Sequence, residues 1–205
     1  MTSKLAREAA RLNAHARSLR ALPSLVLMTD DDRLADPLAA ARALPRGGLI
    51  VLRARNAVRR AALAQALITI ARARELRVSV AGDPELAARC GADGVHFPEA
   101  RIGEAAHWRA CHPHWLITCA AHSLSACARA GAVLADAAFL APVFETDSHP
   151  GGLFLGIFRA RAIARVSPLP VYALGGIDGQ NAARLANGGF VGLAAIGGLS
   201  QDLAR

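Results

Sequence analysis

One stretch of the chain joins an apolar segment to a row of side chains that can do chemistry. Residues 137–144 read AAFLAPVF, and five polar residues, Glu145, Thr146, Asp147, Ser148 and His149, follow before a Pro-Gly-Gly turn. The apolar run is typical of a buried strand, so the change at Glu145 indicates either a solvated loop or one wall of a site. The positions of the other reactive residues decide between these two interpretations.

Two further features suit proton transfer and anion binding. His122 directly follows the apolar run WLITCAA, and an imidazole with a reference pKa near ~6.5 can accept and return a proton. Two other apolar runs end in glycine pairs, Gly175–Gly176 in LGGID and Gly197–Gly198 in IGGLS. Glycine lets backbone N–H groups approach an anion closely, and the N-terminus of a following helix adds partial positive charge. His122 is therefore a candidate acid–base residue, and the glycine pairs predict a phosphate site.

Charged residues near other strand ends leave alternatives open. Arg53 and Arg55 alternate, so both should face the same side of an extended strand. On that side they either bind a carboxylate or phosphate or form ion pairs at the rim. Asp30–Asp32 could hold Mg²⁺, although a single acidic run is more typical of a solvated turn and helix start. His96 lies within an apolar run and is expected to be a packing residue.

The elements that would position these residues alternate along the whole chain. Apolar runs without strict alternation, typical of strands buried on both faces, are separated by Ala/Arg-rich stretches of helical spacing such as 57–76 and 84–92. Ser123 and Asp178 are expected to cap the helices that follow them. The pattern predicts an α/β fold, a compact (β/α)8 TIM barrel over residues 23–205 with an extra N-terminal helix in residues 1–22. The predicted strands are 24–30, 48–54, 77–83, 93–99, 115–122, 137–144, 170–176 and 192–198.

The barrel prediction places the polar residues together. Active sites in this fold lie at the C-terminal ends of the strands, where His122 and the residues from Glu145 to His149 are expected. The polar stretch after residue 144 is therefore predicted to be a wall of the site.

Composition narrows the classes of partner. The chain has 205 residues, is 53% hydrophobic and 4% aromatic, and carries a net charge of +8. Lys4 is the only lysine, and the arginines are dispersed without interleaved aromatics, so neither a nucleic-acid partner nor a membrane is expected. The four cysteines lack metal-binding spacing and are expected to be reduced thiols in a cytoplasmic protein. A homo-oligomer is compatible with the sequence.

Four motifs, in order and with characteristic spacing, carry a family resemblance. They are GADGVHF at 91–97, APVFETDSHPG at 141–151, PVYALGGI at 170–177 and GLAAIGGL at 192–199. Over residues 24–200 the chain resembles the thiamine phosphate synthase/TenI family of small TIM barrels. One branch of that family joins a pyrimidine diphosphate to a thiazole phosphate with Mg²⁺ on the departing pyrophosphate. The other, TenI-like branch isomerises a thiazole phosphate carboxylate tautomer to the aromatic thiazole.

Departures from the synthase pattern fall in the half of the site that would bind the pyrimidine diphosphate. A shift of one residue would restore Asp83 as a ligand, but no such shift restores the others. The departures are Gly82 and Arg101 in place of metal-binding aspartates, Glu99 and Val51 in place of glutamines, Ala120 in place of a serine and His149 in place of a lysine.

The half of the site that would bind thiazole phosphate is retained. Through the resemblance, the two glycine pairs match phosphate loops, Thr146 and Ser148 match hydroxyls that orient the ligand or anchor its phosphate, and His122 matches an acid–base residue. Glu145 and His149 are expected to assist at the same wall.

The resemblance therefore implies a barrel that binds a small phosphorylated heterocycle, a thiazole tautomerase in the leading interpretation. A divergent thiamine phosphate synthase, with Arg53, Arg55, Arg101 and His149 supplying positive charge, is the first alternative. A non-catalytic phosphate-binding regulatory protein is the second. No cofactor is expected, and Mg²⁺ enters only with the synthase alternative, where Asp83, Glu99 or the Asp30–Asp32 run would have to bind it.

Overall fold

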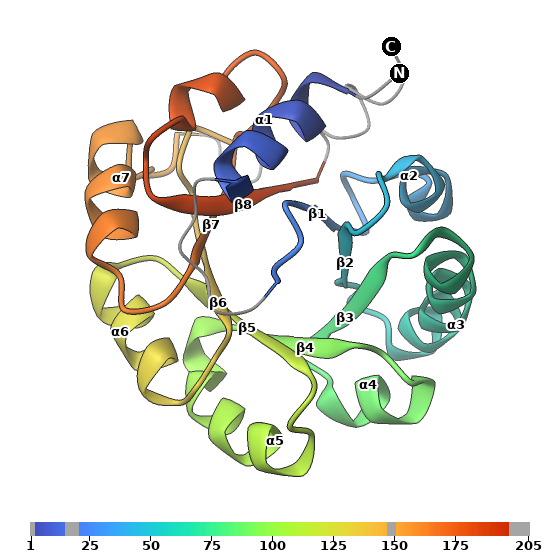
Figure 1. The fold of residues 1–205 in the computed structure, drawn as a ribbon. Helices are drawn as coiled ribbons and strands as arrows, with labels where there is room; N and C mark the ends of the chain where they lie inside the picture. Colours follow the sequence, from blue (N-terminus) through green and yellow to red (C-terminus); the bar gives the residue numbers. More distant parts are fainter. Residues whose placement is uncertain (1–2, 15–20, 147–150, 197–205) are drawn as a thin grey trace.

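Eight parallel strands form a closed barrel in the computed structural model, which describes residues 3–14, 21–146 and 151–196. The strands follow one another in chain order around the barrel, and helices surround them (Figure 1). The predicted α/β TIM barrel is confirmed, and each predicted strand contains or overlaps an observed one. The strands are β1 (Leu25–Met28), β2 (Leu49–Leu52), β3 (Arg77–Ala81), β4 (Gly94–Phe97), β5 (Leu116–Ala121), β6 (Ala137–Leu140), β7 (Val171–Leu174) and β8 (Phe190–Ala195).

The strands separate two apolar cores, because successive side chains point to opposite faces. Val26, Val51, Phe139 and Tyr172 belong to the core inside the barrel. Their neighbours in sequence, such as Leu27, pack outward in a larger core shared with the helices. Burial on both faces explains why the strands read as continuous apolar runs.

Several helices begin at a side-chain cap. Asn56 caps α3 and Ser123 caps α6, each by accepting a hydrogen bond from a backbone N–H of the first turn. The predicted cap at Ser123 is thus confirmed. The described helices are α1 (Lys4–Ala14), α2 (Pro37–Ala43), α3 (Ala57–Arg74), α4 (Pro84–Cys90), α5 (Ala105–Cys111), α6 (Leu124–Ala132) and α7 (Ile157–Val166), with the 3-10 helices η1 (Glu99–Glu104) and η2 (Ala182–Leu185).

The helix expected after Asp178 is much shorter than its sequence suggests. Asp178 does accept hydrogen bonds from the backbone of Gln180 and Asn181, but only the 3-10 turn η2 follows. Arg161 of α7 donates to the carbonyl oxygens of Arg184 and Ala186. The backbone of Ala186 is extended, with ψ at 140°, so the turn ends there, and the two bonds tie this end to α7.

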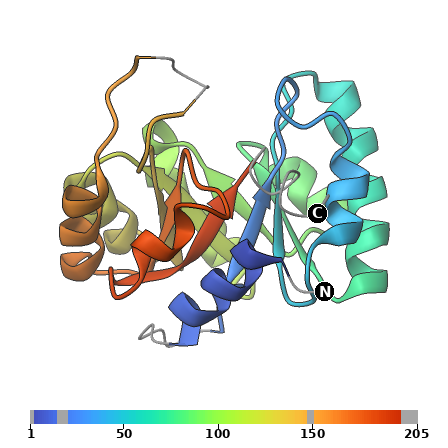
Figure 2. The same ribbon diagram turned by 90° about the horizontal axis from the view of Figure 1, so that it is seen from above.

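Helix α1 covers one end of the barrel, opposite the C-terminal ends of the strands. Its buried residues include Leu5 and Leu12, and Asn13 donates both to the carbonyl of Leu22, ahead of β1, and to that of Val191 in β8. Figure 2 shows α1 on the side away from the loop that follows β6. The domain boundary predicted at residue 22 stays a prediction. No helix among the described residues is long and apolar enough to cross a membrane.

Candidate functional site at the barrel rim

The C-terminal ends of the strands place most of the candidate residues at one rim. Among the described residues these are Asp30 after β1, Arg53 after β2, Glu99 after β4, His122 after β5, Glu145 and Thr146 after β6, and Gly175 and Gly176 after β7. The candidates Ser148, His149, Gly197 and Gly198 lie outside the described residues.

The hydrogen bonds of His122 assign its ring nitrogens. Its Nδ1 lies 2.7 Å from the carbonyl oxygen of Ala141, which can only accept, so Nδ1 carries the proton. The Nε2 atom of the neutral ring is then the one with a free lone pair. The side chain is exposed at the rim, where Nε2 can exchange a proton with a ligand.

The backbone of His122 is held by a second residue. Its N–H donates to Oε2 of Glu99 at 3.0 Å, and Oε1 of Glu99 accepts from Arg129 of α6 at 2.7 Å. Glu99 therefore joins the end of β4 to the end of β5 and to α6.

Glu145 and Thr146 line a small cavity in the wall that follows β6. The cavity is about 230 Å³ and is also lined by Pro142, Gly152, Leu153 and Phe154. Most of its lining residues are apolar, and Glu145 and Thr146 are the polar ones. This is the part of the rim where a ligand can meet a hydroxyl from the β6 loop, residues 141–146.

The glycine pair after β7 allows the β6 loop to pack against it. The N–H of Phe144 donates to the carbonyl of Gly175 at 3.1 Å. A Cβ atom on Gly175 would lie 2.7 Å from Cα of Pro142, and one on Gly176 would lie 2.1 Å from the carbonyl oxygen of Glu145. Both glycines also have positive φ angles, 96° and 64°. The close approach of β6 and β7 is thus a structural reason for these glycines, beside any contact with phosphate.

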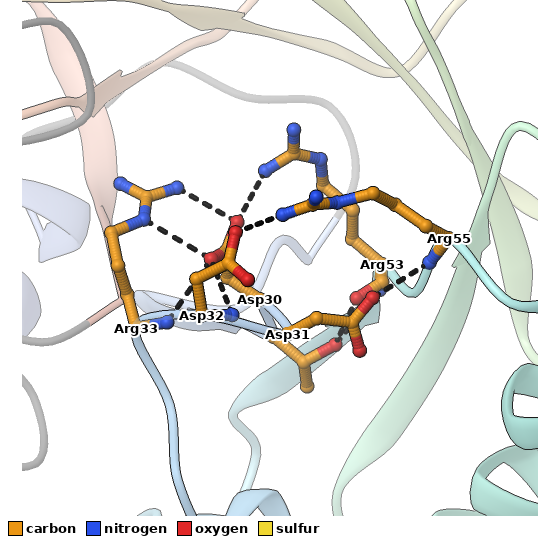
Figure 3. Close-up of polar contacts among 7 residues, drawn as sticks. Asp30, Asp31, Asp32, Arg33, Arg53 and Arg55 are labelled. Carbon is orange, nitrogen blue, oxygen red and sulfur yellow. Dashed lines mark hydrogen bonds and ion pairs between the residues drawn. The ribbon is translucent and has the colours of Figure 1, made fainter.

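Aspartates and arginines interlock at the ends of β1 and β2 (Figure 3). Asp30 accepts from Arg33 and, at 2.6 Å, from Arg53, while Asp32 pairs with Arg55. Both predicted arginines therefore form ion pairs at the rim. Asp30 also accepts from the backbone N–H groups of Asp32 and Arg33.

The acidic run differs from the solvated helix start expected for it. Asp30 is buried, and α2 begins only at Pro37, where Asp36 is the cap. The hydrogen bonds from Arg33, joined by those of the turn and by the charge of Arg53, lower the pKa of Asp30 to about 2 against the effect of burial.

Arg53 and His96 differ in their position relative to the barrel mouth. His96 is buried in the barrel, where its ring lies tilted against that of Phe139 with the centroids 4.8 Å apart. It shares a 2.9 Å hydrogen bond with the hydroxyl of Thr118, so it packs in the interior as the sequence predicts. Burial, reinforced by the charge of Arg53, lowers the pKa of His96 to about 4. Arg53, by contrast, pairs with Asp30 after β1, and its side chain is 53% exposed.

The rim at β3 and β4 does not fit a Mg²⁺ site. Gly82 and Arg101 occupy the positions at which the synthase pattern has metal-binding aspartates. The two residues are in contact, because Arg101 donates to the carbonyl of Gly82 at 2.7 Å. The same guanidinium makes two further hydrogen bonds to Glu104. A cation of the protein therefore lies where oxygen ligands for a metal would be needed.

Each remaining carboxylate considered for a metal already has an arginine partner. Asp83 caps α4 and pairs with Arg60 at 2.8 Å, and Glu99 pairs with Arg129. Within the described ranges, no group of three or more His, Cys, Asp and Glu side chains could hold a metal ion.

Two features of the site were not foreseen from the sequence. One is the bond from Glu99 to the backbone of His122, and the other is the contact between Gly82 and Arg101. The second had a signal, since both residues replace metal-binding aspartates of the family pattern, and two such departures 19 residues apart can compensate each other in space. The first had none, because a side chain that bonds to a backbone N–H 23 residues away leaves no pattern.

Comparisons with known proteins show the family and agree with the fold. A family model described as thiamine monophosphate synthase (TMP-TENI) matches residues 25–199. A thiamine-phosphate synthase from Chlorobium luteolum is 30% identical over 87% of this chain and 86% of its own. One from Methanoculleus marisnigri is 36% identical over 55% of this chain and 54% of its own, and a relative from Aquifex aeolicus is 33% identical over 55% of this chain and 60% of its own. The matches to these last two thus span little more than half of each relative.

A solved structure shows the same barrel. The thiamine phosphate pyrophosphorylase from Pyrococcus furiosus superimposes with a TM-score of 0.71 at 23% identity, covering 87% of this chain and 91% of that one. At this identity the likeness concerns the fold. The match of the family model over residues 25–199 shows more, and the chain belongs to the thiamine monophosphate synthase (TMP-TENI) family.

Proposed function

We propose that this protein is a TenI-like tautomerase that converts a thiazole phosphate carboxylate tautomer to the aromatic thiazole. The observation that carries the proposal is the orientation of His122, whose Nδ1 is bonded to Ala141 and whose Nε2 is left for proton transfer at the rim. A tautomerisation needs one proton removed from carbon and one returned, and a single imidazole can do both.

The chemistry assigns a role to each part of the rim. Nε2 of His122 takes a proton from one carbon of the substrate, and the resulting imidazolium returns a proton to a second carbon. The double bonds shift between these steps, so the product ring is the aromatic thiazole. Glycines 175, 176, 197 and 198 hold the phosphate, with Thr146 or Ser148 as a hydroxyl donor. Glu145 and His149 assist at that wall.

Arginines supply the remaining charge in this proposal. Arg53 is held by Asp30 beside the barrel mouth and is half-exposed, so it can bind the substrate carboxylate. Arg55 is paired with Asp32 further out and adds positive potential rather than a direct contact.

The metal-dependent synthase reaction receives less support from this rim. A pyrophosphate leaving group needs its growing charge neutralised, and the β3–β4 rim offers a salt-bridged Arg101 in place of metal ligands. The names of the relatives favour the synthase as the second candidate function. In that case the exposed arginines of the rim would have to neutralise the diphosphate.

Replacement of His122 tests the proposal. We expect His122→Asn to lower kcat for tautomerisation by about 10²–10⁴-fold, the range of general acid–base catalysis, with aromatic thiazole formation followed by its ultraviolet absorbance. His107→Asn, at an exposed histidine of α5, is the matched control and should leave kcat unchanged. Undiminished turnover in His122→Asn would refute the mechanism.

Calorimetric titration separates the two candidates. Thiazole phosphate binding that is the same with and without Mg²⁺, and no binding of pyrimidine diphosphate, is the expected result. Mg²⁺-dependent binding of pyrimidine diphosphate would instead establish the synthase. Thiazole phosphate binding without turnover of either substrate would leave the protein a non-catalytic phosphate-binding module.

A further inference from the structure

Glu99 occupies a position from which it can hold the acid–base residue. It is the first residue of η1, directly after β4 and Pro98. One carboxylate oxygen accepts the backbone N–H of His122 and the other accepts from the guanidinium of Arg129. The Glu99 side chain is 28% exposed, and it reaches both partners from the side of β4.

His122 needs support of this kind because of its place in the chain. It lies between the last residue of β5 and Ser123, the cap of α6, outside the hydrogen-bonded ladder of the barrel. Its ring is fixed by Ala141 from the β6 side, and its backbone by Glu99 from the β4 side. Only two side-chain torsions separate backbone and ring, so a shift of the backbone moves Nε2 directly.

The element that carries Glu99 is itself anchored on its far side. Arg101 of η1 donates to the carbonyl of Gly82 after β3 and forms a salt bridge with Glu104. Through Arg101 and Glu99, η1 thus connects the end of β3 to the end of β5 across the end of β4. Glu99 and Arg101 are also two of the residues at which the chain departs from the synthase pattern.

We propose that Glu99 is a positioning residue for His122, and that η1 acts as a brace holding the imidazole in place. The inference rests on the proposed role of His122 and adds to it the residue that fixes the geometry. In this assignment, η1 supports proton transfer indirectly, because Glu99 holds the backbone of His122 and does not contact the substrate.

Three variants in the full-length protein test the assignment. Glu99→Ala removes both bonds, and Glu99→Gln keeps an amide oxygen that can accept from His122. Arg129→Ala removes the ion pair and a 3.4 Å bond from Arg129 to Ser125 but leaves the bond between Glu99 and His122. We expect Glu99→Ala to lower kcat by about 10- to 100-fold with KM changed less than about threefold, as expected for a misplaced catalytic group. Glu99→Gln should recover most of this loss, and Arg129→Ala should change kcat by less than about threefold.

A second readout does not depend on activity. Hydrogen exchange of the His122 amide, followed by NMR, should accelerate about tenfold or more in Glu99→Ala and remain near that of the wild type in Glu99→Gln. Unfolding midpoints of all three variants control for general destabilisation, which would accelerate exchange throughout β5 rather than at His122.

Two results would overturn the proposal. One is a Glu99→Ala variant whose His122 amide exchange equals that of the wild type, and the other is a Glu99→Gln variant as impaired as Glu99→Ala. If the wild type shows no tautomerase turnover, the proposed function fails, and the amide exchange still decides whether Glu99 holds His122.

Discussion

Replacement of Asp30 by Asn should destabilise the protein in a way that depends on pH. Asp30 is buried and accepts from Arg33 and Arg53, and its pKa is lowered from 3.8 to about 2. A difference of about 1.8 pKa units corresponds to up to about 2.4 kcal/mol of stability at neutral pH. Asn removes the charge while it keeps an oxygen for the turn.

The sign of the pH dependence follows from the lowered pKa. The folded state holds the carboxylate ionised, so the stabilisation is full well above pH 3.8 and is lost as the pH falls through about 2. The contribution of Asp30 should therefore fall from about 2.4 kcal/mol at pH 6 to about 1.3 at pH 3 and about 0.4 at pH 2.

Urea unfolding measures this contribution. The free energies of unfolding of the wild type and Asp30→Asn are compared at pH 6, 4 and 3, with the fluorescence of Trp108 and Trp115 as the signal. Asp32→Asn is the matched control, since its side chain is 68% exposed and its ion pair should contribute less than about 1 kcal/mol. A difference between wild type and Asp30→Asn that is the same at pH 6 and pH 3 would refute the reasoning.

Two other predictions concern packing and reactivity. Gly176→Ala should lower the free energy of unfolding by about 2 kcal/mol or more, because its Cβ would lie 2.1 Å from the carbonyl oxygen of Glu145 and its φ is positive. Gly103→Ala, where nothing lies within 4 Å, is the control and should lower it by less than about 1 kcal/mol. Thermal unfolding compares the two variants, and equal losses of stability would contradict the close approach. Cys111 should react with a thiol reagent in the native protein far faster than Cys90, Cys119 and Cys127, which are buried and whose pKa values burial raises, to about 12 for Cys119. Mass spectrometry of the labelled protein locates the modified thiol, and equal labelling of Cys119 would count against the buried core.

The strands were predictable because their burial has one simple cause. A strand of a closed parallel barrel is buried on both faces, so most of the strands appear in the sequence as short apolar runs, with single buried polar residues in β3, β4 and β5 (Ser79, His96 and Thr118). The ends of the strands then follow from where polar residues and glycines interrupt these runs, and this located His122, Glu145 and Gly175 at the rim. The cap at Ser123 was predictable for a similar reason, since it depends only on residues within one helical turn.

The features that the sequence did not reveal depend on contacts between distant residues. The helix expected after Asp178 is limited to η2, whose end is bonded to Arg161 of the distant α7. The sequence could not distinguish ligand binding from ion pairing at Arg53, because that depends on whether Asp30 lies within reach. Glu99 was identified only as a departure from a motif, and its bond to His122 required the geometry of β4 beside β5.

The closure of the barrel sets an order for folding. The seam between β1 and β8 pairs Leu25 with Leu193 and Val26 with Ala194, and Asn13 bonds to backbone on both sides of it. Pairing of residues so distant in the chain is slow, since loop closure must precede the gain in contacts. During synthesis, β1 therefore presents an unpaired sheet edge, and α1 lacks one of its partners, until β8 has been made. A chain that ends before β8 would keep that edge open for association with other chains.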